Sequence, residues 1–123
     1  MGAAKTIALV EDEVLIRLEL ADYLRDCGYR VIEANNADEA LMALRSGTDV
    51  DVVLSDVQMP GSMDGFGLAR WIREHRPGMR VILASGVVKS AEAASDLCQD
   101  GPMMQKPYQR ELIVQRIRAL LRE

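Results

Sequence analysis

Short apolar runs rich in Val and Ile alternate along this chain with longer stretches of helical spacing. This alternation is typical of a parallel sheet built from strand-helix-strand units. The first run is apolar at every position, as a strand covered on both faces must be. The runs expected to be strands are residues 6–10, 29–34, 51–55, 79–84 and 103–105.

The stretches between these runs have apolar residues three and four positions apart, the pattern of a helix with one buried face. Gly28 and Gly47 are expected to end the first two helices, and Asn36 or Asn35 to cap the second. The fourth stretch is poor in large apolar residues, so its packing should be light. The expected helices cover about 16–27, 37–47, 64–75, 88–99 and 113–121.

Five strands that alternate with five helices predict an α/β fold, a doubly wound (βα)5 arrangement with a five-stranded parallel sheet in the order 2-1-3-4-5. The 123 residues fit a single domain over 1–123. Hydrophobic residues make up 49% of the chain but aromatic residues only 4%. The core is therefore expected to consist of Val, Ile, Leu, Met and Ala side chains.

Charge and composition disfavour several classes of protein. The net charge is −4 and no block of Lys and Arg occurs, which argues against nucleic-acid binding. No apolar run approaches the roughly 20 residues of a membrane span, so no membrane contact and a cytoplasmic location are expected. Cys27 and Cys98 lie far apart without a histidine cluster, which argues against a zinc site and a disulfide framework.

Polar side chains occur where four of the five expected strands end. The carboxyl ends of parallel strands meet at one edge of a sheet, and functional groups collect there. If the first, third, fourth and fifth strands are neighbours, these side chains lie in one shallow pocket. The residues are Glu11, Asp12, Asp56, Ser85 and Lys106.

This set of residues suits phosphoryl transfer. Three carboxylates repel one another, and Mg²⁺, which binds carboxylate and carbonyl oxygens, would relieve the repulsion. Aspartate is a known nucleophile for covalent phosphoryl intermediates, which points to Asp56. Lys106 can pair with a phosphoryl oxygen, and the Ser85 hydroxyl can donate a hydrogen bond to another.

Four motifs occur in order along the chain: LVEDE at 9–13, LSDVQMPGSMDG at 54–65, ILASG at 82–86 and QKPY at 105–108. Together they resemble the receiver domains of two-component response regulators, of which CheY-like single-domain proteins are the simplest. The resemblance covers essentially the whole chain. It implies the flavodoxin/CheY-like form of the doubly wound fold.

The resemblance also implies a role for each matched residue. Asp56 would be the phosphoacceptor, Asp12 a direct magnesium ligand, and Glu11 an acid that acts on the metal largely through water. Gln58 would contribute its backbone carbonyl to the metal. The residues that would contact the phosphoryl group are Ser85 and Lys106.

By the same resemblance, the donor would be a histidine kinase or a phosphotransfer protein, and the domain would catalyse only its own phosphorylation and dephosphorylation. Output would pass through the face made by the fourth helix, fifth strand and fifth helix to a protein target. No output domain is expected after the last helix, so a partner is expected to act. A monomer, a weak homodimer and a piece of a longer hybrid kinase all stay open.

The chain departs from the family pattern at three places. Met103 stands where the family often has an aromatic residue that takes part in switching, Glu11 replaces the commoner Asp, and the loop over residues 60–65 is one residue longer.

Two other functions stay open. A small aspartyl-phosphate phosphatase is disfavoured by Gln58, because such enzymes have a second aspartate there. A receiver-fold binding module that works without phosphorylation is the other alternative. Glu11 and Asp12 could also merely cap the first helix.

Overall fold

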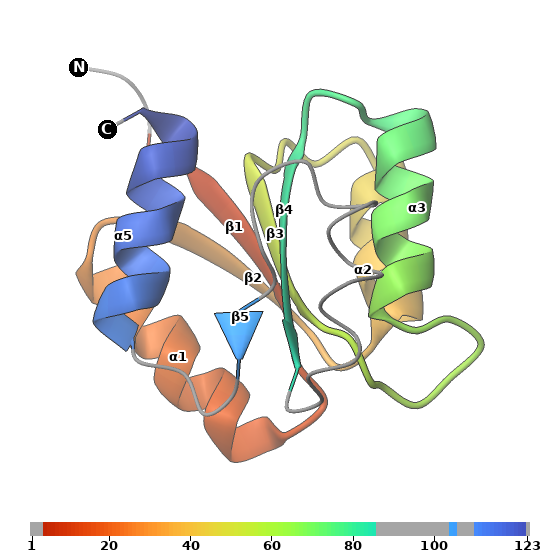
Figure 1. The fold of residues 1–123 in the computed structure, drawn as a ribbon, viewed down its shortest axis with the longest axis horizontal. Helices are drawn as coiled ribbons and strands as arrows, with labels where there is room; N and C mark the ends of the chain where they lie inside the picture. Colours follow the sequence, from red (N-terminus) through yellow and green to blue (C-terminus); the bar gives the residue numbers. More distant parts are fainter. Residues whose placement is uncertain (1–3, 86–103, 106–109, 123) are drawn as a thin grey trace.

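The computed structural model describes residues 4–85, 104–105 and 110–122 (Figure 1). The helix expected over 88–99 lies outside these residues, as do Met103 and Lys106. The strands are β1 Thr6–Val10, β2 Arg30–Ala34, β3 Val52–Asp56, β4 Arg80–Ser85 and β5 Met104–Gln105. The helices are α1 Val14–Asp26, α2 Ala37–Arg45, α3 Gly65–His75 and α5 Arg110–Leu121.

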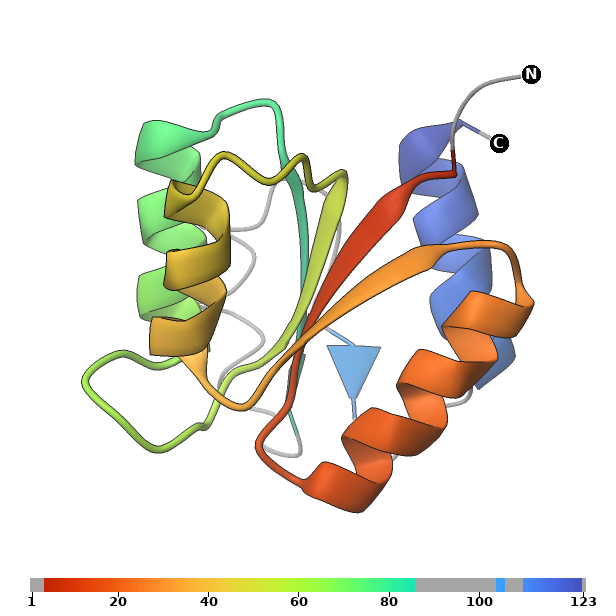
Figure 2. The ribbon, with the colours of Figure 1, turned by 180° about the vertical axis from the view of Figure 1, so that it is seen from behind.

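The strands form one parallel sheet between two layers of helices. The four longer strands have the order β2-β1-β3-β4, which confirms the predicted order 2-1-3-4, and the two-residue β5 pairs with β4 at the edge. Helices α2 and α3 cover one face of the sheet, and α1 and α5 cover the other, as the opposite views in Figures 1 and 2 show. The α/β fold predicted from the sequence is confirmed.

Alternate residues along each central strand enter different cores. Ile7 and Leu9 of β1 pack on the side of α1 and α5, whereas Ala8 and Val10 pack on the side of α2 and α3. The same division holds for Val52 and Leu54 against Val53 in β3. This two-sided burial explains why the strands are apolar at consecutive positions instead of alternating with polar residues.

Among the four longer strands, β2, β3 and β4 begin one residue later than the sequence pattern indicates, at Arg30, Val52 and Arg80. β3 starts at Val52 because Asp51 lies at the turn, where its Oδ2 accepts a hydrogen bond from the backbone N of Thr6 at 2.8 Å. At the other end, β3 includes Asp56, which pairs with Ala84, and β4 includes Ser85, which pairs with Gln105. β2 begins at Arg30, with Tyr29 buried just before it.

The helix ends follow the expected capping chemistry. Asn36 is the N-cap of α2, and its Oδ1 accepts a hydrogen bond from the N of Glu39 at 2.9 Å. Asp64 caps α3 in the same way through the N of Gly67 at 2.9 Å. Gly28 and Gly47 follow α1 and α2 with φ of 98° and 87°, the left-handed conformation that favours glycine. The predicted ends of these helices are confirmed.

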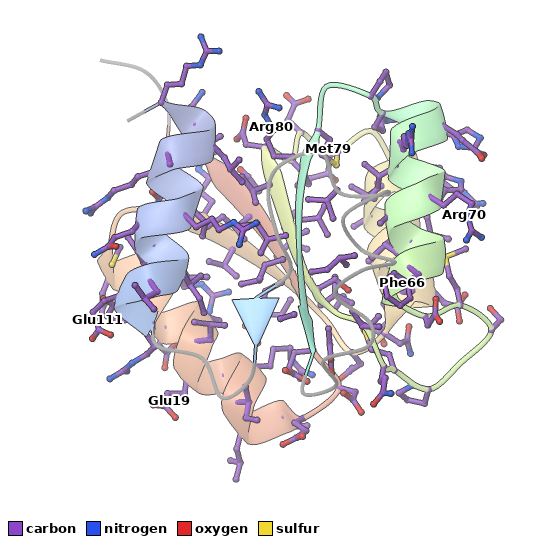
Figure 3. All side chains as sticks on the ribbon, in the orientation of Figure 1. Glu19, Phe66, Arg70, Met79, Arg80 and Glu111 are labelled. Atoms are coloured by element: carbon purple, nitrogen blue, oxygen red, sulfur yellow. The ribbon has the colours of Figure 1, made fainter. Side chains whose placement is uncertain are left out.

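The outer surface of α1 carries both charged and apolar side chains. Arg110 of α5 pairs with Glu19 of α1 at 3.5 Å, and Figure 3 labels Glu19 on the outside of that helix. Val14, Leu15 and Leu18 of α1 are exposed. Among the helices that the structure describes, none combines the length and the apolar character needed to cross a membrane.

Strand β2 forms one edge of the sheet, so its outer backbone groups have no strand partner. Arg25 of α1 reaches over this edge, and its Nη2 donates to the carbonyl of Val31 at 3.1 Å. The side chains of Arg30 and Glu33 also lie on β2. The edge strand is therefore flanked by charged groups.

Truncating a central core residue should reveal the importance of the two-sided burial. Leu54 of β3 is fully buried, so Leu54→Ala is expected to lower the free energy of unfolding by about 2–5 kcal/mol. Leu15→Ala is the matched control, because Leu15 is 82% exposed, and a change within about 0.5 kcal/mol is expected there. Urea denaturation measures both, and equal losses would contradict the assignment of the core.

Candidate metal and phosphoacceptor site

Three carboxylates meet at the carboxyl edge of the sheet, where β1 and β3 end side by side. The register pairs Val10 with Ser55, so Glu11 and Asp56 come next on neighbouring strands. One carboxylate oxygen from each of Glu11, Asp12 and Asp56 lies within 4.8 Å of the other two. The structure thus brings together the three acids that the strand-end pattern predicts to converge.

The three acids differ in exposure. Glu11 is 1% exposed and Asp56 is 7% exposed, whereas Asp12 is exposed. Two carboxylates are thus largely withdrawn from water beside a third that faces it. At such separations each pair of ionised carboxylates costs on the order of 1–4 kcal/mol of repulsion, depending on the local dielectric. A cation that reaches the cluster from the Asp12 side would remove this cost.

Backbone contacts fix Glu11 at the end of β1. Its N donates to the carbonyl of Ala34 in β2 at 3.0 Å, and its Oε2 accepts from the N of Glu13 at 3.3 Å. The N-cap of α1 is Glu13, and it makes no side-chain capping bond. Neither Glu11 nor Asp12 is therefore the N-cap residue itself, although the Glu11 carboxylate bonds to the N of the N-cap residue.

Asp56 is held by the start of the loop that follows it. The N of Val57 donates to the carbonyl of Ala84 in β4 at 3.0 Å, and the N of Gly65 donates to the carbonyl of Val57 at 2.8 Å. The Ser55 hydroxyl donates to the carbonyl of Asp56 at 2.9 Å. These bonds fix the backbone on both sides of the carboxylate.

Gly65, the first residue of α3, is a part of the site that sequence reasoning missed. A Cβ at this position would lie 2.2 Å from the carbonyl oxygen of Asp56 and 2.8 Å from the Cα of Val57. Both neighbours are backbone, so neither can rotate away, and only glycine allows α3 to start this close to β3. The motif over 54–65 contains this glycine, but spacing alone does not reveal the close contact.

The loop between β3 and α3 is bonded to α2. Asp38 accepts hydrogen bonds from the Ser62 hydroxyl at 2.7 Å and from the Ser62 N at 3.4 Å. Gly61 allows the turn beside it with φ of 112°. The bonds between Ser62 and Asp38 thus anchor the loop to α2.

The structure describes less of the other residues that the sequence predicts for the site. Gln58 is exposed two residues beyond Asp56, and the role of its carbonyl stays a prediction. Ser85 is the last residue of β4, next to Ala84, which pairs with Asp56 in the sheet. The side chain of Ser85 and the whole of Lys106 lie outside the described residues, so their contacts with the site also stay predictions.

The donor set fits Mg²⁺. This ion prefers oxygen ligands at about 2.1 Å in octahedral geometry, so two direct ligands lie at most about 4.2 Å apart. Carboxylate oxygens within 4.8 Å of one another need only a small closure, or one bridging water, to share such an ion. Mg²⁺ usually keeps several waters, and the exposed position of Asp12 leaves room for them.

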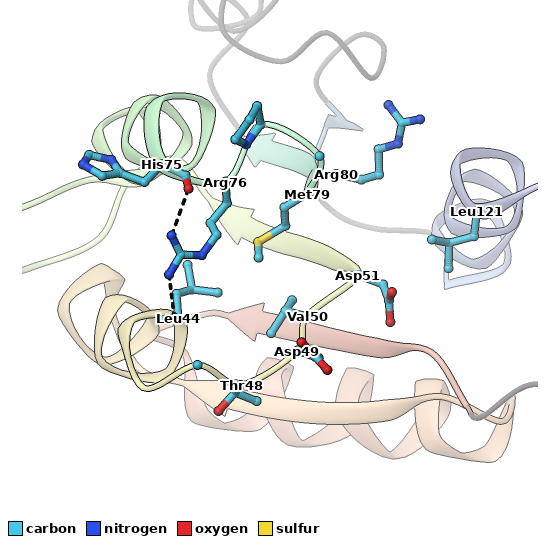
Figure 4. A pocket seen from close by; sticks show the side chains of 13 residues that line it. Leu44, Thr48, Asp49, Val50, Asp51, His75, Arg76, Met79, Arg80 and Leu121 are labelled. Carbon is cyan, nitrogen blue, oxygen red and sulfur yellow. Dashed lines mark hydrogen bonds between the residues drawn. The ribbon is translucent and has the colours of Figure 1, made fainter.

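A cavity of about 470 Å³ lies at the opposite edge of the sheet (Figure 4). Its lining includes Asp51 and Arg80, which lie at the start of β3 and β4, and Asp56 is not part of it. Arg76 crosses it and donates to the carbonyls of His75 at 2.9 Å and Leu44 at 3.5 Å. These bonds join the ends of α2 and α3, so this region has a structural role.

Comparison with known families agrees with the site geometry. The sequence profile of the family described as the response regulator receiver domain matches residues 7–118. The chain belongs to this family. The acidic cluster of this receiver domain thus has the composition expected for Mg²⁺ and for an aspartyl phosphate.

Curated relatives of this receiver domain are longer proteins. The sensor kinase CckA of Brucella abortus is 39% identical over 94 residues, which are 76% of this chain and 10% of the kinase. The transcriptional regulatory protein ResD of Bacillus subtilis is 35% identical over 121 residues, or 94% of this chain and 48% of that protein. The receiver domain therefore spans about half or less of these relatives.

Solved structures confirm the fold of the receiver domain. A response regulator receiver protein from Sinorhizobium medicae is 30% identical with a TM-score of 0.87, and the match covers 97% of this chain and 95% of that one. TrrA from Thermotoga maritima, solved in complex with Mg²⁺-BeF, is 27% identical with a TM-score of 0.84 and coverage of 94% and 98%.

Substitution of Gly65 tests the close contact between the start of α3 and the carbonyl of Asp56. We expect Gly65→Ala to destabilise the receiver domain by about 1–3 kcal/mol, as overpacking against rigid atoms does. Gly78→Ala is the matched control, because a Cβ at Gly78 meets nothing within 4 Å. Urea denaturation compares the two variants, and an unchanged midpoint for Gly65→Ala would show that the backbone beside Asp56 can move.

Proposed function

We propose that this receiver domain accepts a phosphoryl group on Asp56 from a histidine kinase or a phosphotransfer protein, with Mg²⁺ bound at the acidic cluster. The observation that supports this most directly is the convergence of Glu11, Asp12 and Asp56 within 4.8 Å. Asp12 and Asp56 would bind the ion directly, Glu11 largely through water, and Gln58 through its carbonyl.

Asp56 would act as the nucleophile. One of its carboxylate oxygens attacks the phosphorus of the donor phosphohistidine, the P–N bond breaks, and the imidazole leaves. The fixed backbone around Asp56 reduces the number of orientations that the carboxylate samples before attack. When bound, Mg²⁺ supplies charge neutralisation for the phosphoryl oxygens and the acids. We propose that Lys106 and the Ser85 hydroxyl contact the remaining phosphoryl oxygens.

The relatives support this assignment of partners. They include a sensor kinase and a transcriptional regulatory protein, the two kinds of protein between which a phosphoryl group would pass. The structure of TrrA with Mg²⁺-BeF supports the use of the same ion here. We propose that the signal leaves through the surface formed by the segment 88–99, β5 and α5, where the segment 88–99 completes the (βα)5 arrangement as its fourth helix.

Two further points belong to the proposal. The domain would modify only itself and would not turn over an external substrate, in keeping with the general role of receiver domains in signalling. A cytoplasmic location fits the free thiol of Cys27, since unpaired cysteines are usual in reducing compartments.

Phosphorylation by a small-molecule donor tests the proposal. Incubation with acetyl phosphate and Mg²⁺ should add the mass of one phosphoryl group, and removal of Mg²⁺ with a chelator should prevent the gain. Asp56→Asn should abolish it, because the amide is not nucleophilic. Asp49→Asn is the matched control, since Asp49 is exposed at the opposite edge of the sheet, and it should be modified normally. Intact-mass spectrometry measures all four samples.

The same assay separates the alternatives. A chain that binds Mg²⁺ but never gains mass would support a binding module that works without phosphorylation. Repeated turnover of an unrelated phosphomonoester would favour a phosphatase. Modification that persists in Asp56→Asn would contradict the assignment of the phosphoacceptor.

A further inference from the structure

We propose that Arg17 of α1 is a positioning residue for the magnesium site, which it serves by holding the peptide between Glu11 and Asp12. This inference rests on the function proposed above and extends it to a side chain outside the acidic cluster. The guanidinium contacts neither the ion nor the phosphoryl group in this proposal. It acts through the backbone that carries two of the three acids.

The guanidinium of Arg17 bonds to the ends of two strands at once. Its Nη1 donates to the carbonyl of Glu11 at 2.9 Å and also to Oδ1 of Asn35. Its Nε donates to Oε1 of Glu33 at 3.3 Å. The planar fork of arginine suits such a task, because its donors point in fixed directions. One side chain thus connects α1 to the carboxyl ends of β1 and β2.

Arg17 is shielded from water and its partners are themselves held. Its side chain is only 11% exposed, and that of Glu33 is 23% exposed. Glu33 also accepts from Nη2 of Arg25 at 3.1 Å. Asn35 donates from its backbone N to Oε1 of Glu39 at 2.8 Å, which keeps the pKa of the Glu39 carboxyl below its usual value. The anchor points of Arg17 are therefore themselves fixed.

The bond to the Glu11 carbonyl matters because of where that carbonyl lies. It belongs to the peptide that links Glu11 to Asp12, so any rotation of this peptide changes the direction of the Asp12 side chain. The N of Glu11 is already bonded to Ala34. With the carbonyl held as well, both polar groups of the backbone at Glu11 are fixed while its carboxylate faces two others.

Electrostatics explains why such a restraint would be useful. The three carboxylates repel one another before a cation arrives, and the exposed Asp12 is the member with most freedom to turn away. Each restraint on the Glu11–Asp12 peptide lowers the free energy needed to gather the ligands around the ion. Residues that orient metal ligands from behind commonly change metal affinity by about 10- to 100-fold when removed.

Arg25 provides a matched control on the same helix. It pairs with Glu33, as Arg17 does, at 3.1 Å. Its other partners are Asp22 and the carbonyl of Val31, whereas Arg17 bonds to the carbonyl of Glu11. If Arg17 only anchored α1 to β2, then removal of either arginine should have similar effects on the site.

The experiment compares wild type, Arg17→Met and Arg25→Met in two measurements. Isothermal titration calorimetry gives the Mg²⁺ dissociation constant without any phosphoryl donor. The initial rate of phosphorylation by acetyl phosphate is then measured over a range of Mg²⁺ concentrations. Arg17→Lys is a fourth protein, because it keeps the charge and should fold even where Arg17→Met does not, but it lacks the planar fork.

We expect Arg17→Met to raise the Mg²⁺ dissociation constant about 10-fold, while its phosphorylation rate at saturating Mg²⁺ stays close to that of wild type. Arg17→Lys should raise the constant in the same direction by a smaller factor. Arg25→Met should raise it much less than Arg17→Met does, because Arg25 reaches the site only through Glu33. This separation of affinity from maximal rate is the readout that a merely structural role would not produce.

Two results would overturn the proposal separately from the function. Normal Mg²⁺ binding by wild type together with an unchanged constant in both Arg17 variants would overturn the role of Arg17 alone. The same holds for a rate that falls equally at all Mg²⁺ concentrations with no change in affinity. A wild-type chain that does not bind Mg²⁺ would instead overturn both this inference and the proposed function.

Discussion

Each central strand of the sheet is buried on both faces, so its polar and charged side chains find room only where the strand begins or ends. Ile7 and Leu9 fill one core while Ala8 and Val10 fill the other, and the first acidic residue comes directly after them. Because parallel strands all end at the same edge, acids that follow β1 and β3 must be neighbours. The position of the candidate site is thus a consequence of how the core is built.

At the site itself, a fixed backbone holds together three carboxylates that repel one another. Two carboxylates with 1% and 7% exposure lie beside a third, which is unfavourable for the isolated domain. The backbone N of Glu11 bonds to β2, that of Val57 next to Asp56 bonds to β4, and α3 begins against the carbonyl of Asp56 at Gly65. Rigid surroundings of this kind keep ligands close together where flexible ones would let them separate.

Much of this could be predicted from the sequence, and the rest depends on contacts between distant residues. Apolar continuity predicted the strands, and the position of acids at strand ends predicted the site. β3 and β4 each extend one residue further than expected, because the pairing between them continues through Asp56 and Ala84. The close contact at Gly65 and the reach of Arg17 across two strand ends have no local pattern. Both arise only when segments far apart in the chain are packed together.

The charged groups along β2 have a consequence for how copies of the protein meet. An open edge strand offers backbone groups to any other strand, which favours edge-to-edge association and aggregation. Here a guanidinium covers one outer carbonyl at Val31, and any second strand that approached would have to displace it and desolvate Arg30 and Glu33. The β2 edge is thereby protected against pairing with the strand of a second copy.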